Sequence, residues 1–430
     1  MSWSFHRYYT NRTDGLISKL KLSDEKSGYL KALRKQIRAR TRDVFEEAKK
    51  LAEETRTSTV NLREKVAATH FRHLSPEAQK EVEELINALG NEARESFLRL
   101  KPRFWTQGSF QYDTLNVPYS TPPQEMDIDD GTYLPMALFD DKPIIGHRLL
   151  LLLVDTSLKS LVAENDGWIF EAKRTCARIK IPSENTHIDV PMYAIPEDQF
   201  VLKEVAIESF RKMAFDSVDA RAEAWMVNRD EYELDSDSVN LALREGEQKW
   251  AKSDPKIVED WFLESCRVNG WHLRKVCRFM KAWRDAQWKE KGPSSISLMA
   301  ATLNVLNKYT HDSTDLGATM SLIALHLPEE FRKGVESPDH TDDKPLFPPV
   351  EAHGEWEQDV ITKLEELKNY LSEADTAETK ELALKALNKA FGDRVTDHDL
   401  IDRKVAGPAY HEEPSKALKP VVISQTMSSG

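Results

Sequence analysis

The sequence predicts an α+β protein, with a mixed sheet and its helices in the first half and a helical lobe in the second. Strand-like stretches gather between residues 127 and 195, and apolar residues recur at helical spacing on both sides of them. Glycine is scarce, at 16 of 430 residues, so helices should dominate. A chain of this length buries more than one core, and we expect domains at 1–205 and 206–405 and a flexible tail at 406–430.

The composition is that of a soluble protein without a broad basic surface. The formal charge is −12, whereas a general nucleic-acid binder needs a basic footprint, so we expect no stable DNA or RNA template. The N-terminus has no apolar signal core, and the longest aliphatic run, residues 149–154, is too short to span a bilayer. Cys176, Cys266 and Cys277 match no zinc pattern, so we expect reduced thiols in a cytoplasmic protein with no membrane anchor.

The first elements are expected to be helices. From about Lys26, apolar residues recur as they do along an amphipathic helix. A second helix should begin at Ser75 and Pro76, an N-cap followed by a first-turn proline, and run to about residue 101. The opposite face of the first helix is either a site for a polyanion or, as is commoner, a solvated charged face. That face carries Lys31, Arg34, Lys35, Arg38, Arg40 and Arg42.

Strands follow, and the loop between two of them predicts how they pair. We predict a strand over 133–139, a buried leucine-rich helix over 143–162, and strands over 168–181 and 186–195. If the loop 182–185 closes symmetrically, Lys180 pairs with His187 and Arg178 pairs with Asp189. Directly paired residues share a face of the sheet, so one face of this hairpin is polar and the other is apolar core.

Helices are expected from about residue 200 onward. One should begin at Asp254 and Pro255, a second spans 273–288 and carries Lys281, and a break at 292–295 precedes an apolar helix that runs to 306. Residues 334–356 are rich in Pro, Asp and His and should form a long loop. Helices then resume at 356–370 and 376–391.

The candidate catalytic centre is a set of three aspartates. In an extended strand, residues i and i+2 point to one face, so Asp127 and Asp129 can bind the same cations, and Asp189 on a neighbouring strand would complete the set. Gly108 and Ser109 would hold a triphosphate through backbone and hydroxyl donors. Mg²⁺ prefers carboxylate ligands, and a pair of such ions can align a hydroxyl and neutralise a leaving pyrophosphate. We therefore expect nucleotidyl transfer with a pair of Mg²⁺ ions, or with Mn²⁺ in their place.

Each part of this constellation also has a plainer explanation. Gly-Ser pairs are common in turns, Asp-x-Asp sequences are common in surface loops, and Asp189 could be an ion-pair partner of Arg178. An EF-hand is excluded because Gly131 and Leu138 stand where its fifth and twelfth loop positions need ligands. A phosphatase nucleophile usually follows an apolar strand directly, whereas residues 122–125 are Pro-Pro-Gln-Glu.

Taken together, the motifs resemble the bacterial cyclic-oligonucleotide synthases (CD-NTases), and among them the DncV-like dinucleotide cyclases. They occur in order and cover most of residues 100–310. The similar stretches are QGS at 107–109, MDIDDGTYLP at 126–135, TCARIKIP at 175–182, HIDVPMYAIP at 187–196, SDPKIVEDWF at 253–262, KAWRDAQW at 281–288 and GPSSISLM at 292–299.

The resemblance implies a polymerase-β-like nucleotidyltransferase core beside a helical lobe, with the active site between them. It implies that Asp127, Asp129 and Asp189 hold the metal ions and carry catalysis. The residues alone also allow plainer explanations: Arg178 could equally form an ion pair, Lys281 could be a solvated helix residue, and Ser295 could be an N-cap. The loop around Asp342 departs from the family pattern. The residues that would contact nucleotide are Gln107, Gly108, Ser109, Arg178, Ser253, Lys281, Ser295 and Asp342.

The resemblance also implies template-free joining of nucleoside triphosphates into a cyclic product. We expect 3′,3′-cyclic GMP-AMP from ATP and GTP, with cyclic di-AMP or another cyclic oligonucleotide as alternatives. Similar enzymes act in anti-phage (CBASS) operons, many of which encode an E1/E2-like partner that conjugates the synthase through its C-terminus. Gly430 would suit such conjugation, and it is equally consistent with an ordinary loose end.

Two further function classes stay open at the level of sequence. One is a linear oligonucleotide or tRNA-end polymerase on the same core, although the acidic net charge disfavours the tRNA version. The other is a nucleotide-binding sensor with a relict site, which the intact set of Asp127, Asp129 and Asp189 disfavours.

Overall fold

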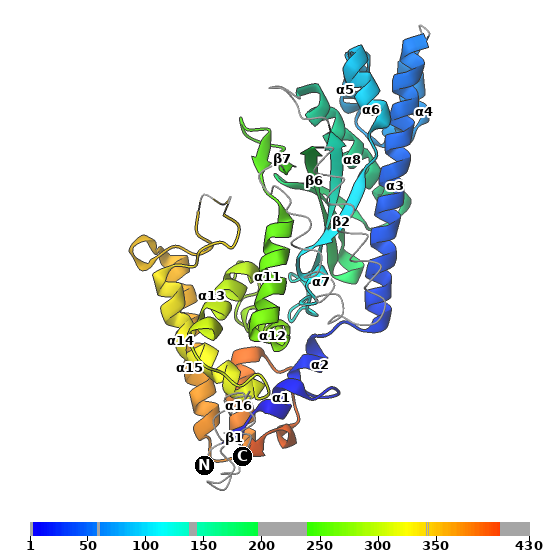
Figure 1. Ribbon diagram of the computed structural model, residues 1–430. Coiled ribbons are helices and arrows are strands. Elements are labelled where there is room, and N and C mark those ends of the chain that lie inside the picture. Colours follow the sequence, from blue (N-terminus) through cyan, green and yellow to red (C-terminus); the bar gives the residue numbers. More distant parts are fainter. Residues whose placement is uncertain are drawn as a thin grey trace, which may run out of the picture.

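The chain forms two lobes (Figure 1), seen in a computed structural model that describes residues 3–57, 61–136, 144–196, 239–340, 342 and 344–404. Each lobe has its own large hydrophobic core, one around a sheet and one among helices. The predicted α+β class, with a mixed sheet and a helical lobe, is confirmed. The expected boundary at residue 205 and the tail at 406–430 lie outside the described residues.

The sheet of the first lobe is mixed, with strand order β2-β3-β6-β5-β4. Strands β3 and β6 run parallel, and the other neighbours run antiparallel. The predicted hairpin register is confirmed, because Lys180 pairs with His187 and Arg178 pairs with Asp189. The strands span Arg103–Gln107 (β2), Met126–Met136 (β3), Ile169–Ala172 (β4), Cys176–Ile181 (β5) and Thr186–Pro196 (β6).

The predicted strands were wrong in three respects. The strand expected at 133–139 begins at Met126, so the acidic pair lies within it. The strand expected at 168–181 is two strands, because residues 173–175 turn the chain. Helices were expected after residue 200, yet Asn240–Ala242 (β7) and Trp250–Lys252 (β8) extend the sheet beside β6. Strands as short as β7 and β8 show too little alternation to be recognised by periodicity.

Helices pack against this sheet and bury its apolar side. The long helix α3 (Asp24–Thr57) runs beside the sheet in Figure 1 and packs on α8 (Ile144–Glu164). Ser75 caps α5 as predicted, since its Oγ accepts the Ala78 amide at 3.2 Å. The helix expected from there to residue 101 is two helices, which meet at Gly90. The smaller helices are α4 (Leu62–Ala68), α5 (Pro76–Asn87), α6 (Asn91–Arg99) and α7 (Gly108–Gln111).

The second lobe is helical, and the N-terminal segment belongs to its core. Phe5, Tyr8 and Tyr9 are buried there, although we had expected these residues with the 1–205 unit. Strand β1 (Trp3–Ser4) pairs with β9 (Asp402–Arg403) at the base of this lobe. Its helices are α1 (His6–Thr10), α2 (Leu16–Leu20), α11 (Pro255–Asn269), α12 (His272–Gln287), α13 (Ser295–Lys308), α14 (Leu316–Lys333), α15 (Glu355–Thr376) and α16 (Lys380–Phe391).

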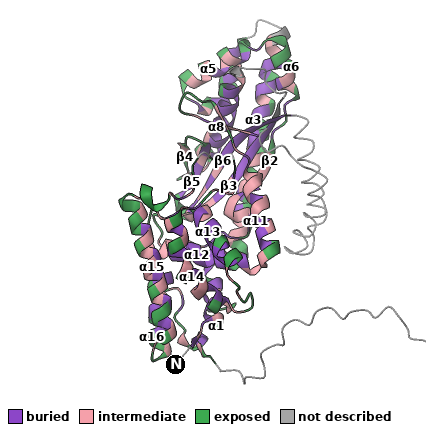
Figure 2. Ribbon diagram, turned by 60° about the vertical axis from the view of Figure 1, so that its left-hand side comes forward, coloured by how far each residue is buried: buried purple, intermediate pink, exposed green. Residues whose placement is uncertain are grey.

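A junction segment, residues 113–124, connects the two lobes through hydrogen bonds. It connects α7 to β3, and its backbone and side chains bond mainly to α12. Asn116 Nδ2 donates to the Arg278 carbonyl at 2.8 Å, and Gln124 Nε2 donates to the Asp285 and Trp288 carbonyls at 2.7 and 2.8 Å. Figure 2 shows buried residues along β3, β5 and β6 and again around α12 and α13. None of the helices in the described part of the chain is long and apolar enough to cross a membrane.

Candidate active site

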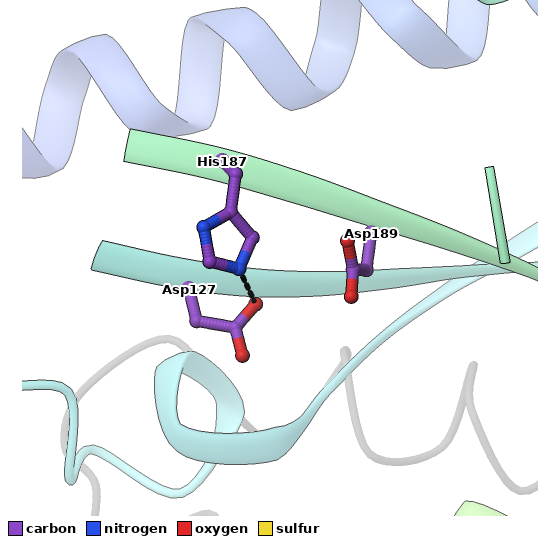
Figure 3. A group of neighbouring side chains, drawn as sticks. All are labelled: Asp127, His187 and Asp189. Carbon is purple, nitrogen blue, oxygen red and sulfur yellow. Dashed lines mark ion pairs between the residues drawn. The ribbon is translucent and has the colours of Figure 1, made fainter. Parts of the chain in front are cut away.

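Three aspartates lie on the two parallel strands at the centre of the sheet. The register pairs Asp129 on β3 with Asp189 on β6, and it pairs Asp127 with His187. Ligand atoms of Asp127, His187 and Asp189 lie within 4.8 Å of one another. Figure 3 shows these side chains gathered beside β3 and β6. Sequence spacing thus predicted the placement of the aspartates, and their catalytic roles stay a prediction.

The crowding of negative charge alters the pKa values of the cluster. Burial, together with the charges of Asp127 and Asp189, raises the pKa of Asp129 to about 8. Burial also opposes ionisation of Asp127, but the contact with His187 and the charge of Arg178 outweigh it and lower the pKa of Asp127. A divalent cation would offset the repulsion that raises the pKa of Asp129, and Mg²⁺ prefers such carboxylate oxygens. The residues present therefore fit a divalent metal ion.

Gly108 allows the chain to pass close to Asp129. It follows β2 directly and begins α7 with a φ of +64°. A Cβ atom at position 108 would lie 2.3 Å from Asp129 Oδ2. Glycine is the residue that tolerates both the left-handed backbone and this approach. Ser109 follows in the first turn of α7, so the Gly-Ser pair lies beside the carboxylates.

Arg178 pairs with the third aspartate. Its Nε donates to Asp189 Oδ1 at 2.6 Å and its terminal nitrogen donates to Oδ2 at 2.8 Å, in the bidentate geometry that favours arginine. The contact is the main cause that raises the pKa of Arg178. The ion-pair alternative for Arg178 therefore holds in this structure, and a contact with nucleotide stays a prediction.

His187 belongs to the site, although we assigned it no role from the sequence. Its Nε2 lies 3.0 Å from Asp127 Oδ1, and its Nδ1 lies 2.9 Å from Glu125 Oε2. Lys180 Nζ in turn lies 2.8 Å from Glu125 Oε1. The hairpin register already placed Lys180 beside His187, but the parallel pairing of β3 with β6 was needed to bring His187 to Asp127.

Gln107 serves packing through its side chain. Its Nε2 donates to the Tyr133 hydroxyl at 2.9 Å, and its Oε1 accepts from the Tyr193 hydroxyl at 3.2 Å. The two tyrosine rings stack with centroids 4.7 Å apart. The buried amide thus ties β2 to the tyrosines of β3 and β6, and this arrangement leaves the backbone as the part of Gln107 suited to a nucleotide contact.

Lys281 reaches from α12 of the helical lobe into the junction between the lobes. Its Nζ donates to the Thr114 carbonyl at 2.8 Å, and its side chain is buried. Burial, followed by the charge of Arg284, lowers the pKa of Lys281 to about 7, and the charges of Lys281 and Asp127 act on each other. The alternative of a solvated helix lysine is wrong, because α12 turns this residue toward the first lobe.

The other predicted nucleotide contacts lie at element ends of the helical lobe. Ser295 begins α13 and accepts a bond from the Arg284 guanidinium at 2.8 Å, while Ser294 is the N-cap, so the N-cap alternative for Ser295 is wrong. Ser253 precedes α11, which Asp254 caps.

Asp342 accepts a bond from the Ser337 hydroxyl at 2.6 Å. Within the described residues, no hydrogen bond or ion pair joins Ser253, Ser295 or Asp342 to the three aspartates. Gly430 lies outside the described part of the chain.

Comparison with known proteins covers both lobes. Residues 102–193 match the family described as Cyclic GMP-AMP synthase DncV-like, nucleotidyltransferase domain, and residues 270–404 match Cyclic GMP-AMP synthase, C-terminal domain. The cyclic GMP-AMP synthase of Vibrio cholerae serotype O1 is 60% identical over the full length of both chains.

Solved structures of the Vibrio cholerae protein have the same fold. DncV in complex with the linear intermediate 5′ pppA(3′,5′)pG aligns with a TM-score of 0.85 at 60% identity, covering 94% of this chain and 100% of that one. A variant of that cyclase with ATP and GTP among its ligands aligns with a TM-score of 0.86 at 59% identity, with the same coverage.

Proposed function

The chain belongs to the DncV-like cyclic GMP-AMP synthases, nucleotidyltransferases that make a cyclic dinucleotide, and we propose that it makes 3′,3′-cyclic GMP-AMP from ATP and GTP. The main observation behind this proposal is the aspartate cluster on the neighbouring strands β3 and β6, with the backbone of Gly108 packed close to Asp129. Identity over the full chain supports the choice of substrates, because the Vibrio cholerae protein bears the name of that product.

The chemistry consists of successive nucleotidyl transfers. In the first, the 3′-hydroxyl of ATP attacks the α-phosphorus of GTP, one phosphodiester bond forms, and one pyrophosphate leaves. The linear intermediate pppApG bound to the Vibrio cholerae enzyme has this linkage. In the second, the 3′-hydroxyl of the guanosine attacks the α-phosphorus of the adenosine end, closes the ring and releases another pyrophosphate.

Residues of both lobes have roles in these transfers. Asp127, Asp129 and Asp189 would hold a pair of Mg²⁺ ions, with Mn²⁺ as an alternative, and such ions activate a hydroxyl and offset phosphate charge. Gly108 has no side chain and so leaves room for the Asp129 carboxylate. An ammonium carries three donors, so Lys281 can keep its bond to Thr114 and still donate to a phosphate oxygen.

The biological setting follows from the family resemblance. We infer a cytoplasmic enzyme whose cyclic product signals in anti-phage (CBASS) defence and whose C-terminal Gly430 is available to an E1/E2-like conjugation partner. Cyclic di-AMP, another cyclic oligonucleotide and a linear oligonucleotide are the competing products. They differ from the proposed one in mass or in sensitivity to phosphatase.

Incubation with ATP, GTP and Mg²⁺ tests the proposed reaction. The wild-type chain should release pyrophosphate and form a phosphatase-resistant product. The double variant Asp127→Asn with Asp129→Asn keeps the size of both side chains and removes both charges, so it should lose at least about 1000-fold in rate. Product at the wild-type rate from this variant would contradict the metal assignment, and a phosphatase-sensitive product would favour a linear polymerase.

A further inference from the structure

We propose that His187 is a positioning residue that orients the Asp127 carboxylate for the metal ions, and that Glu125 and Lys180 hold His187 in turn. This inference rests on the proposed function, because it concerns the same metal site. The three side chains form a continuous row with Asp127, linked at 2.8, 2.9 and 3.0 Å. Figure 3 shows the end of this row, where His187 reaches Asp127.

The sheet itself builds this row. The parallel register sets Asp127 of β3 directly beside His187 of β6, and the antiparallel register sets Lys180 of β5 on the other side of His187. Glu125 immediately precedes β3 and closes the row from its end. Because directly paired residues share a face, backbone pairing sets both Asp127 and Lys180 beside His187, and Glu125 links His187 to Lys180 from the residue before β3.

Burial differs along the row: the supporting residues His187 and Glu125 are buried more deeply than the proposed metal ligand Asp127. The side chains of His187 and Glu125 are each 12% exposed, whereas that of Asp127 is 50% exposed. One oxygen of Asp127, Oδ1, faces His187, and the carboxylate remains open to solvent on its other side. A ligand carboxylate held in this way is already ordered before the ion binds. Metal binding therefore does not have to overcome the loss of side-chain rotamer entropy.

The contacts of the imidazole ring favour this role over direct coordination. Both ring nitrogens already face carboxylate oxygens, Nε2 toward Asp127 and Nδ1 toward Glu125. Mg²⁺ prefers oxygen ligands to imidazole nitrogen. Direct ligation of the metal ion by His187 is therefore the competing interpretation. The two can be distinguished with Mn²⁺, because a coordinated imidazole nitrogen modulates its spin echo.

The test uses Mn²⁺ as the probe, with the full chain and a nonhydrolysable ATP analogue. Free Mn²⁺ measured by electron paramagnetic resonance gives the affinity. His187→Gln places an amide nitrogen near the position of Nε2 and should bind Mn²⁺ within about threefold of wild type, whereas His187→Asn cannot reach Asp127 and should weaken binding about 10- to 100-fold. His70→Ala removes a contact of similar length, between His70 Nδ1 and Glu47 Oε1 at 2.8 Å, away from the aspartates, and should leave the affinity unchanged.

Spin-echo modulation of the bound Mn²⁺ in wild type supplies a second measurement that needs no variant to fold. Positioning predicts no modulation from a directly coordinated imidazole nitrogen. Such modulation, or unchanged affinity in His187→Asn, would overturn this inference while leaving the proposed function in place. Absence of both Mn²⁺ binding and pyrophosphate release in the wild-type chain would overturn the proposed function and this inference with it.

Discussion

At the scale of single residues, the site depends on how closely Gly108 approaches Asp129. The Asp129 carboxylate occupies the space that any Cβ at position 108 would need. Gly167 offers a matched comparison, because it also has a positive φ, +80°, but nothing lies within 4 Å of a Cβ built there. The two glycines share the backbone requirement, and only Gly108 has the contact with an active-site residue.

We expect Gly108→Ala to lose about 100-fold in the rate of pyrophosphate release, because a displacement of Asp129 by about 1 Å misaligns the metal ligands. Gly167→Ala should keep the wild-type rate and lose only about 1 kcal/mol of unfolding free energy from left-handed backbone strain. Steady-state kinetics and urea unfolding of both variants check this. Equal rates in the two variants would contradict the assigned role of Gly108.

Glu259 of α11 is a buried acid that contacts the first lobe. Its carboxylate accepts from Trp105 Nε1 at 3.1 Å and from Gln111 Nε2 at 3.0 Å. Burial is the main cause that raises its pKa to about 7, and Lys256 partly opposes the shift. The folded chain therefore keeps a proton that the unfolded chain releases above its ordinary pKa of about 4.5. The contribution of Glu259 to stability thus falls as the pH rises from about 4.5 to about 7.

Glu259→Gln should remove this pH dependence. Between about pH 5 and pH 7.5, the unfolding free energy of wild type should fall relative to the variant, by up to about 3 kcal/mol. Urea unfolding at both pH values measures the difference. Glu264→Gln, a change at a partly exposed position on the same helix, should follow the wild-type profile. Parallel profiles for wild type and Glu259→Gln would show that Glu259 is already ionised in the folded chain.

Sequence spacing predicted the site residues whose positions depend on local geometry. Asp127 and Asp129 follow from strand alternation, and the pairing of Arg178 with Asp189 follows from the closing loop. Residues that depend on long-range contacts were harder to assign from the sequence. His187 was missed because only the parallel pairing of β3 with β6 brings it to Asp127. The solvated alternative for Lys281 stayed open, because the sequence does not show which way α12 faces.

At the scale of elements, the junction segment connects the Gly-Ser turn and the aspartate-bearing strand β3 of the first lobe to α12. Arg278 is buried and donates to the Asp113 carbonyl at 3.0 Å, to the Asp113 carboxylate at 2.8 Å, and to the Leu115 carbonyl. The segment leads directly from Gly108 and Ser109 to β3. Its anchoring therefore sets the distance between the Gly-Ser turn, the aspartates and Lys281.

Arg278→Lys should loosen this anchor. A single ammonium cannot satisfy the same set of acceptors, and each buried acceptor left without a partner costs about 1–3 kcal/mol, so we expect a loss of about 2 kcal/mol in unfolding free energy and a lower kcat. Arg267→Lys on α11 changes an exposed bidentate pair with Glu264 and should cost less than about 0.5 kcal/mol. Similar stabilities for the two variants would contradict the anchoring role.

Periodicity predicted the long elements and failed for the short ones. Helices α3, α8 and α12 and the hairpin of β5 and β6 carry enough repeats to be recognised. Strands β7 and β8 and helices α1 and α2 are each five residues or shorter, and their positions depend on contacts with distant segments. The aromatic residues of the N-terminal segment are therefore explained by the core of the helical lobe and not by any local pattern.

At the scale of the whole molecule, the acidic net charge predicts an enzyme that nucleic acid does not activate. A chain with a formal charge of −12 should bind polyanions weakly. We therefore expect added double-stranded DNA or RNA to change the rate of pyrophosphate release by less than about twofold at physiological salt. A large stimulation would contradict this and would indicate an activating surface.

The identity of the product tests the central claim most directly. Wild-type chain given all four nucleoside triphosphates with Mg²⁺ should release two pyrophosphates for each product molecule, since two phosphodiester bonds form. Mass spectrometry, with digestion by a nuclease specific for 3′,5′ linkages, should identify 3′,3′-cyclic GMP-AMP as the main product. A linear oligonucleotide as the main product, or no phosphodiester product from a folded chain, would contradict the account.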